Sequence, residues 1–256
     1  MSSGARARAG AVAVTAALLP ALLAACGGGA DKPSTAASAT STFPQSNGPA
    51  NLNPADFTTQ IDNPYFPLPL GAQWHVRVTD QEGTVQHEVI TVTDRTRRMG
   101  DGVTARVVHD LVSEGGKPVE TTNDWYAQDK HGNVWYFGED TAEIKPNGQR
   151  DTSGSFEAGV NGADAGVAML AQPTPGQTYR EEYYAGHAED RSRVLALDQQ
   201  AEVPFGHFRD VILTEDYSPV EPNVLELKMY APGIGQVLAQ TVSGGSEREE
   251  LISFEK

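Results

Sequence analysis

From about residue 73 to the C-terminus, apolar and polar side chains alternate with a period of two. No other feature constrains the fold more. Trp74, Val76 and Val78, for example, alternate with polar neighbours. Successive side chains on a β-strand point to opposite faces, so this period predicts half-buried strands rather than helices. Turns that contain Gly or Pro separate the alternating stretches. We therefore expect an all-β domain of about eleven antiparallel strands in a curved sheet, half-barrel or barrel, with few short helices.

The expected strands lie around 74–79 and 85–92, and at 103–112, 118–128, 133–138, 177–184, 190–198, 207–217, 223–231, 235–242 and 248–255. Short helical turns are expected near 54–59 and within 156–172. The widest gap in the strand pattern, 145–176, is interpreted as a long loop, because it is rich in Gly and Pro.

The first expected hairpin joins the strands around 74–79 and 85–92. A two-residue turn at Glu82 and Gly83 would place Val76 opposite Val89 and Arg77 opposite Glu88. We predict this register because it pairs apolar with apolar side chains and opposite charges with each other.

A second expected hairpin, DWYAQDKHGNVWYFGED at 124–140, is rich in aromatic residues. The segment from Asp129 to Gly132 suits a type I turn with Gly132 at a left-handed bulge position. Counting outward from this turn places Trp125, Trp135 and Phe137 on one face. We expect that face to belong to the core.

The other face of this hairpin carries Tyr126, Tyr136 and Asp124. Phenol rings supply apolar area with a polar tip, so these residues are the candidate ligand-binding side chains. Ordinary cross-strand packing would also explain the two tyrosines. A hydrolase that uses carboxylates near Asp124, Glu139 and Asp140 is a further alternative, although Glu139 and Asp140 at the end of a strand are expected to be solvated.

The N-terminus has the pattern of an export signal. Arg6 and Arg8 precede the apolar run 11–25, and Cys26 follows. An apolar run of about 15 residues is shorter than the roughly 20 that a membrane-spanning helix needs. We therefore expect 1–25 to be a signal peptide and 26–52 a flexible tether, because this segment is rich in Gly, Ala, Ser, Thr and Pro. Residues 53–256 would form a single β-rich domain.

The segment Leu23-Ala24-Ala25-Cys26 resembles the lipobox of bacterial lipoproteins. This resemblance implies cleavage before Cys26, lipidation of its thiol and anchoring of an exported protein to the cell membrane or outer membrane. An ordinary secretory signal would instead leave a free thiol there. Removing 1–25 deletes Arg6 and Arg8 and no acid, so the net charge changes from −15 to −17.

Composition excludes several functions. A net acidic chain without a Lys/Arg cluster is a poor nucleic-acid binder. One Cys rules out an intrachain disulfide framework and a Cys-rich zinc site. The six His residues form no metal-binding pair, and no nucleotide-binding or catalytic serine motif is present. We expect no metal and no cofactor.

Three phrases together resemble a family of bacterial secreted proteins and lipoproteins. They are Ile61–Leu68 (IDNPYFPL), the aromatic hairpin at 124–140, and Tyr230–Gly235 (YAPGIG). The resemblance covers roughly 57–256 and carries no catalytic residues over. The strand–APGIG–strand pattern is also similar to late strands of half-barrel envelope lipoproteins that bind lipid or lipoprotein acyl chains. In the first phrase, Pro64 and Pro67 favour an extended segment that closes one end of the sheet.

These observations favour a non-enzymatic, lipid-anchored envelope lipoprotein that binds an apolar or amphipathic ligand or another envelope protein. The alternatives are an envelope hydrolase and a purely structural interaction module. A cavity would distinguish ligand binding from a module with a solid core. Clustered carboxylates with perturbed pKa values inside a cleft would favour the hydrolase.

Overall fold

A computed structural model describes residues 50–256, which form one antiparallel, barrel-shaped sheet. The all-β prediction is confirmed, but the strands number sixteen rather than eleven. One short 3₁₀-helix, Pro54–Asp56, precedes them. The strands are β1 (Phe57–Thr58), β2 (Gln73–Thr79), β3 (Val85–Arg98), β4 (Thr104–Glu114), β5 (Lys117–Asp129), β6 (Val134–Ile144), β7 (Arg150–Asp151), β8 (Phe156–Glu157), β9 (Asp164–Met169), β10 (Thr178–Arg180), β11 (Glu182–Tyr183), β12 (Arg191–Val203), β13 (Gly206–Ser218), β14 (Glu221–Ala231), β15 (Gly235–Ser243) and β16 (Arg248–Glu255).

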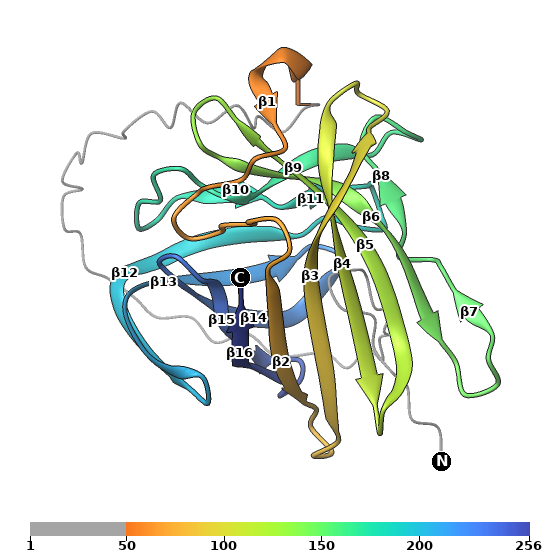
Figure 1. The fold of residues 1–256 in the computed structure, drawn as a ribbon, viewed down its shortest axis with the longest axis vertical. Helices are drawn as coiled ribbons and strands as arrows, with labels where there is room; N and C mark the ends of the chain where they lie inside the picture. The colour runs from red at the N-terminus through yellow and green to blue at the C-terminus, as the bar shows by residue number, and fades with distance from the viewer. Residues whose placement is uncertain (1–49) are drawn as a thin grey trace, which may run out of the picture.

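The sheet comes close to forming a ring. Its strand order is β10-β12-β13-β14-β15-β16-β2-β3-β4-β5-β6-β9-β11. The first and last strands of this order, β10 and β11, are separated in the chain by Glu181 alone. The two edges of the sheet are therefore joined covalently at one point. Figure 1 shows β3, β4 and β5 side by side on one wall, with β12 and β13 on the other.

Three strands lie in the stretch that the sequence predicts to be a loop. The segment 145–176 contains β7, β8 and β9, and the helical turns expected within 156–172 are wrong. Strand β9 pairs with β6 and β11, so it belongs to the wall. Its sequence, DAGVAM, contains three small residues, Ala165, Gly166 and Ala168. A Cβ atom on Gly166 would lie 2.0 Å from the carbonyl oxygen of Glu181, so only glycine permits this approach of the two backbones.

The predicted register of the first hairpin is wrong by one residue. Val76 pairs with Glu88, and Arg77 pairs with His87. The loop has three residues rather than two, because Asp80 closes it by accepting from the Thr84 amide and donating its own amide to the Thr84 carbonyl. This shift turns Glu88 into the interior and leaves His87 exposed.

The second hairpin forms as predicted near its turn. Asp129 lies opposite Asn133, Gly132 has a φ of 92°, and Tyr126 pairs with Tyr136. The predicted Trp face is buried: Trp135 and Phe137 are at most 1 % exposed. Further from the turn the pairing slips at a bulge.

That bulge lies at Gly138 on β6. Between the pairs Tyr126–Tyr136 and Asp124–Glu139, two residues of β6, Phe137 and Gly138, lie opposite Trp125 alone. Gly138 has a φ of 106°, and a Cβ atom there would lie 2.2 Å from the Phe156 carbonyl oxygen. The extra residue turns Glu139 to the same side of the sheet as Asp124.

The three phrases that carry the family resemblance meet in space. The backbone amide of Asn63 donates to Gln128 at 2.9 Å, and its side chain donates to the Gly132 carbonyl. The Gly233 amide donates to the Pro64 carbonyl at 2.7 Å. The segment Ile61–Leu68 therefore bridges the aromatic hairpin and the β14–β15 turn. It is not extended as expected, because it turns at Pro64 and Tyr65, where the Phe66 amide donates to the Asn63 carbonyl at 3.2 Å.

The N-terminal predictions fall largely outside the described residues. The expected signal peptide, Cys26 and the tether up to residue 49 are not described. At the end of the expected tether, the Ala50 amide donates to Asp164 at 2.6 Å, and Leu52 packs against the main core. No helix within 50–256 is long and apolar enough to cross a membrane.

Candidate functional site

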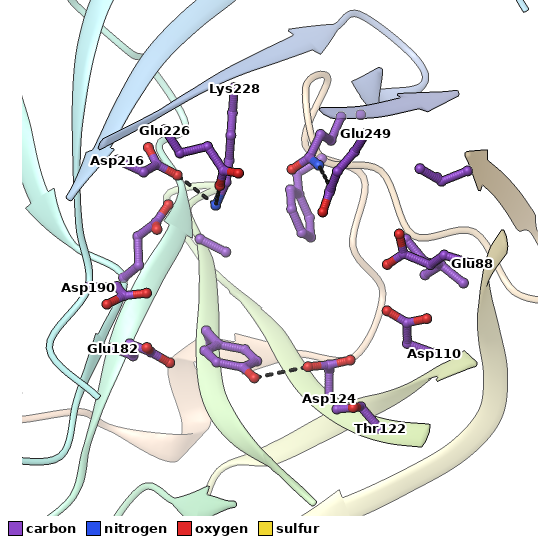
Figure 2. Close-up of a pocket in the computed structure, with 18 of the residues that line it drawn as sticks. Glu88, Asp110, Thr122, Asp124, Glu182, Asp190, Asp216, Glu226, Lys228 and Glu249 are labelled. Atoms are coloured by element: carbon purple, nitrogen blue, oxygen red, sulfur yellow. Dashed lines mark hydrogen bonds and ion pairs between the residues drawn. The ribbon is translucent and has the colours of Figure 1, made fainter. Parts of the chain in front are cut away.

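A cavity of about 410 Å³ lies inside the sheet. Among the described residues, thirteen carboxylate side chains and one basic side chain, Lys228, line it. Figure 2 shows several carboxylates from β3–β5 facing others from the β12–β14 wall. The acidic lining residues are Glu88, Asp110, Glu120, Asp124, Glu139, Glu181, Glu182, Asp190, Asp216, Glu221, Glu226, Glu247 and Glu249.

The three side chains predicted to bind ligand all line this cavity. The Tyr136 hydroxyl donates to Asp124 Oδ1 at 2.9 Å. The Tyr126 and Tyr136 rings lie 5.0 Å apart, centroid to centroid. Antiparallel pairing of β5 and β6 positions them, because Tyr126 and Tyr136 are direct cross-strand partners.

Aromatic side chains extend the apolar wall toward one end of the barrel. The Phe66 ring lies 5.3 Å from Tyr126 and 6.5 Å from Tyr230, so the segment 61–68 does place an aromatic side chain over this end of the sheet. Trp74 also lines the cavity, and its indole N–H donates to the Ile234 carbonyl at 2.8 Å. The cavity thus combines aromatic faces with carboxylates.

Glu139 and Asp140 were both expected to be solvated, which is wrong for Glu139. Its side chain is 2 % exposed and lines the cavity, whereas Asp140 is exposed on the outer side. The bulge at Gly138 causes this, since it places Glu139 rather than Gly138 opposite Asp124. The hydrolase alternative therefore retains two of its three carboxylates inside the cavity.

Burial changes the acidity of these two groups. Desolvation raises the pKa of Asp124 to about 7, the hydrogen bond from Tyr136 opposes that rise, and the charges of Glu88 and Glu120 add to it. Desolvation, followed by repulsion from Asp124, raises the pKa of Glu139 well above its usual range. Burial therefore favours the protonated form of both carboxyls.

A second group of acids lies on the opposite wall around Lys228 (Figure 2). The Lys228 ammonium lies 2.7 Å from Asp216 Oδ2 and 3.6 Å from Glu226 Oε2. Burial alone would lower the pKa of Lys228, but Asp216 and Glu181 raise it well above the usual value. This lysine therefore stays charged and neutralises part of its own group of acids.

Glu182 and Asp190 complete this side of the cavity. Glu182 is 3 % exposed, and desolvation followed by repulsion from Asp190 and Glu139 raises its pKa well above the usual range. Desolvation also raises the pKa of Asp190. Glu182 sits on β11, the strand that nearly closes the ring, so its place depends on the closure.

Sequence reasoning missed most of the acidic lining, although a signal was present. Glu120, Thr122, Asp124 and Tyr126 occupy alternate positions of β5 and all line the cavity. The same spacing recurs on β14, with Glu226, Lys228 and Tyr230. On a half-buried strand of an antiparallel sheet, polar residues at period two face solvent. In a barrel with a cavity, the same pattern marks the inner wall.

The donor set shows no arrangement for a metal ion. Within residues 50–256, no group of three or more His, Cys, Asp or Glu side chains is placed so that it could hold one.

Comparison with known proteins gives one structural likeness. No family model matches the chain, and no curated protein matches it significantly. A crystal structure from Parabacteroides distasonis, of a protein that its description provisionally names a lipoprotein, aligns with a TM-score of 0.41 and 11% sequence identity. The alignment covers 75% of this chain and 98% of that chain. A likeness this small carries no functional argument, so the function rests on this chain's own residues.

Proposed function

We propose that the chain is an exported lipoprotein of the bacterial cell envelope that binds a small amphipathic ligand inside its barrel-shaped sheet. The observation that carries the ligand role is the cavity of about 410 Å³, which joins aromatic faces to carboxylates. Ligand sites typically have volumes of about 300–1,000 Å³ and few charged groups among apolar walls. Here the charged groups are unusually many, so the ligand must itself be polar at one end.

The cavity also bears on the structural-module alternative. A module that served only as a scaffold would be expected to fill its interior with side chains, as close-packed cores do. Instead, buried carboxylates such as Glu139 and Glu182 line a cavity of about 410 Å³. Burying such groups is unfavourable unless a partner compensates them. A bound ligand supplies that compensation.

The anchor rests on the sequence. Cys26 follows an apolar run and two small residues, which is the pattern that a lipoprotein signal requires. A mature chain of charge −17 is repelled by anionic lipid surfaces, so attachment depends on acyl chains. Two or more such chains give stable anchoring. The tether would then hold the domain beside the membrane, close to a source of amphipathic ligands.

A second candidate function is hydrolysis at Asp124 and Glu139. The observation that favours it is the pair of buried carboxyls beside Tyr136 with raised pKa values, since such values occur often at catalytic sites. A hydrolase would cleave chromogenic glycosides or esters, and Asp124→Asn would abolish the cleavage. No turnover of such a panel, together with reversible binding, would favour the non-enzymatic function.

The ligand role is tested with three compounds of equal chain length: octylamine, octanoate and 1-octanol. The mature full chain, held in nanodiscs of zwitterionic lipid, is titrated with each, and empty nanodiscs serve as the blank. At least one compound should bind saturably and raise the melting temperature, because binding to the native state alone stabilises it. If none of the three binds saturably, the proposed ligand function is contradicted.

A further inference from the structure

The chemistry of the cavity wall specifies the ligand more narrowly. This inference rests on the proposed ligand function. We propose that the cavity accepts an organic cation: a protonated amine with an apolar body, whose ammonium group lies beside Glu139 and Glu182 and whose body lies against Tyr126 and Tyr136.

The charge of the cavity wall favours a cationic ligand. Thirteen carboxylates and one lysine line the cavity among the described residues. Lys228 is engaged by Asp216 and Glu226, so its charge is already used on its own wall. The wall that carries Asp124 and Glu139 contributes no basic side chain to the lining. An anionic ligand would increase the repulsion there, whereas a cation would reduce it.

The hydrogen bonding of two buried carboxyl groups also favours a ligand that donates. Oε1 of Glu139 and Oε1 of Glu182 are buried and have no hydrogen-bond partner within the described part of the chain. The two side chains are 2 % and 3 % exposed and both line the cavity. An unsatisfied buried acceptor is costly, and such groups in native structures usually have a partner. Only a donor can satisfy a carboxylate, and an ammonium group offers three N–H bonds.

The opposite wall already holds an ammonium group in this way. Lys228 Nζ lies 2.7 Å from Asp216 and 3.6 Å from Glu226, inside the same cavity. Figure 2 shows this amine enclosed by carboxylates. Glu139 and Glu182 supply comparable acceptors without a lysine of their own. A ligand amine would take the role there that Lys228 takes on its wall.

The aromatic side chains of the cavity wall favour a ligand with an apolar body. The Tyr126 ring lies between Tyr136, at 5.0 Å, and Phe66, at 5.3 Å. These rings give an apolar surface next to the acids. Aromatic faces also attract organic cations through the negative face of the ring quadrupole. A metal ion would make no use of this surface, and the acids within 50–256 are not grouped to hold one.

The test compares affinities in the mature full chain in zwitterionic nanodiscs at pH 7.5. Octylamine should bind at least tenfold more tightly than octanoate or 1-octanol. Glu139→Gln and Glu182→Gln should each weaken octylamine binding at least tenfold. Asp140→Asn is the matched control, because Asp140 adjoins Glu139 on the same strand but points outward, and it should change the affinity less than twofold.

A second measurement needs no variant. Titration of octylamine at pH 6.5, in buffers that differ in ionisation enthalpy, should show net proton release. The ammonium favours the ionised form of carboxyls that are partly protonated in the free protein.

The outcomes separate the two proposals. Octanoate or 1-octanol binding as tightly as octylamine would overturn the amine inference and leave the ligand function standing. Calcium binding that displaces octylamine and is lost in both Gln variants would also overturn it, in favour of a metal site. Octylamine binding without proton release, and unaffected by both Gln substitutions, would overturn it as well.

Discussion

The Tyr136 hydroxyl donates to Asp124 Oδ1 at 2.9 Å, across the β5–β6 pair and inside the barrel. This bond links the aromatic and acidic parts of the cavity wall. It also opposes the rise in the pKa of Asp124 to about 7 that burial causes. Its strength should therefore depend on whether Asp124 is ionised.

Tyr136→Phe removes the donor and keeps the ring. We expect a loss of about 1–3 kcal/mol in the free energy of unfolding at pH 8, where Asp124 is ionised, and a smaller loss at pH 5. Urea denaturation at both pH values measures this. Tyr126→Phe in the neighbouring ring is the matched control and should have less effect. An equal loss at both pH values would show that the bond is insensitive to ionisation.

Gly138→Ala tests the bulge that turns Glu139 inward. Its new Cβ atom would lie 2.2 Å from the Phe156 carbonyl oxygen. Gly148→Ala is the control, because Gly148 also has a positive φ, of 81°, but has no atom within 4 Å of such a Cβ. Both substitutions should lower the free energy of unfolding by about 1–2 kcal/mol, because a residue with a Cβ atom is strained in the left-handed backbone conformation. Gly138→Ala should lower the free energy of unfolding by about 1–3 kcal/mol more, because its Cβ atom collides with the Phe156 carbonyl oxygen. Equal destabilisation would mean that the Phe156 segment moves away freely.

Trp135→Ala should destabilise the protein by about 3–5 kcal/mol, because the side chain is 1 % exposed and its indole N–H donates to Asp129 at 2.9 Å. Phe205→Ala, at a side chain that is 40% exposed, should change stability much less. Chemical denaturation compares the two. Similar effects would place Trp135 outside the core.

Stability should fall as pH rises toward 8 in the absence of ligand. Buried carboxyls such as Asp124, Glu139 and Glu182 have pKa values raised by desolvation. Between their unfolded values, near 4, and their folded values, the native state binds more protons than the unfolded chain. The stability that these carboxyls contribute is fully present below about pH 4. It is lost as the pH rises through their pKa values in the folded protein, and that pKa is about 7 for Asp124. Urea midpoints should therefore be higher at pH 5.5 than at pH 8, and Asp124→Asn should flatten the difference. A urea midpoint that rises between pH 5.5 and pH 8 would contradict the predicted direction of this pH dependence.

Cys26→Ala should release the protein from the membrane fraction or leave it as an uncleaved precursor, because no other attachment to anionic lipid is expected at a mature charge of −17. Metabolic labelling with a fatty acid checks this. Wild type should carry the label and Cys26→Ala should not. Equal label in both would remove the lipoprotein assignment.

The two hairpins show how far the sequence predicts the fold. The segment from Asp129 to Gly132 was interpreted as a three-residue loop with a glycine bulge, which is correct. Asp80 and Gly83 have the same spacing and form the same loop, with Asp80 Oδ1 accepting from two backbone amides. The predicted register used a shorter turn instead, because that turn pairs Val76 with Val89 and Arg77 with Glu88. A surface ion pair is worth little, whereas turn geometry fixes the register.

The cavity was harder to predict. Tyr126, Tyr136 and Asp124 were identified because they share one face of a short hairpin, and local counting is reliable there. Glu182 and Lys228 come from distant strands that only the closure of the ring brings near them. Glu139 was misplaced because the predicted strand ended at 138, whereas β6 continues to Ile144 and the bulge at Gly138 turns Glu139 inward.

Native mass spectrometry tests most directly whether the barrel interior is a ligand site. The full chain is extracted in detergent from the membranes of its own host, and its mass is compared before and after acid unfolding. We predict that the native complex is heavier than the lipidated chain by the mass of one small molecule, and that this molecule dissociates on unfolding. A mass equal to that of the lipidated chain alone, and unchanged after incubation with octylamine, would contradict it.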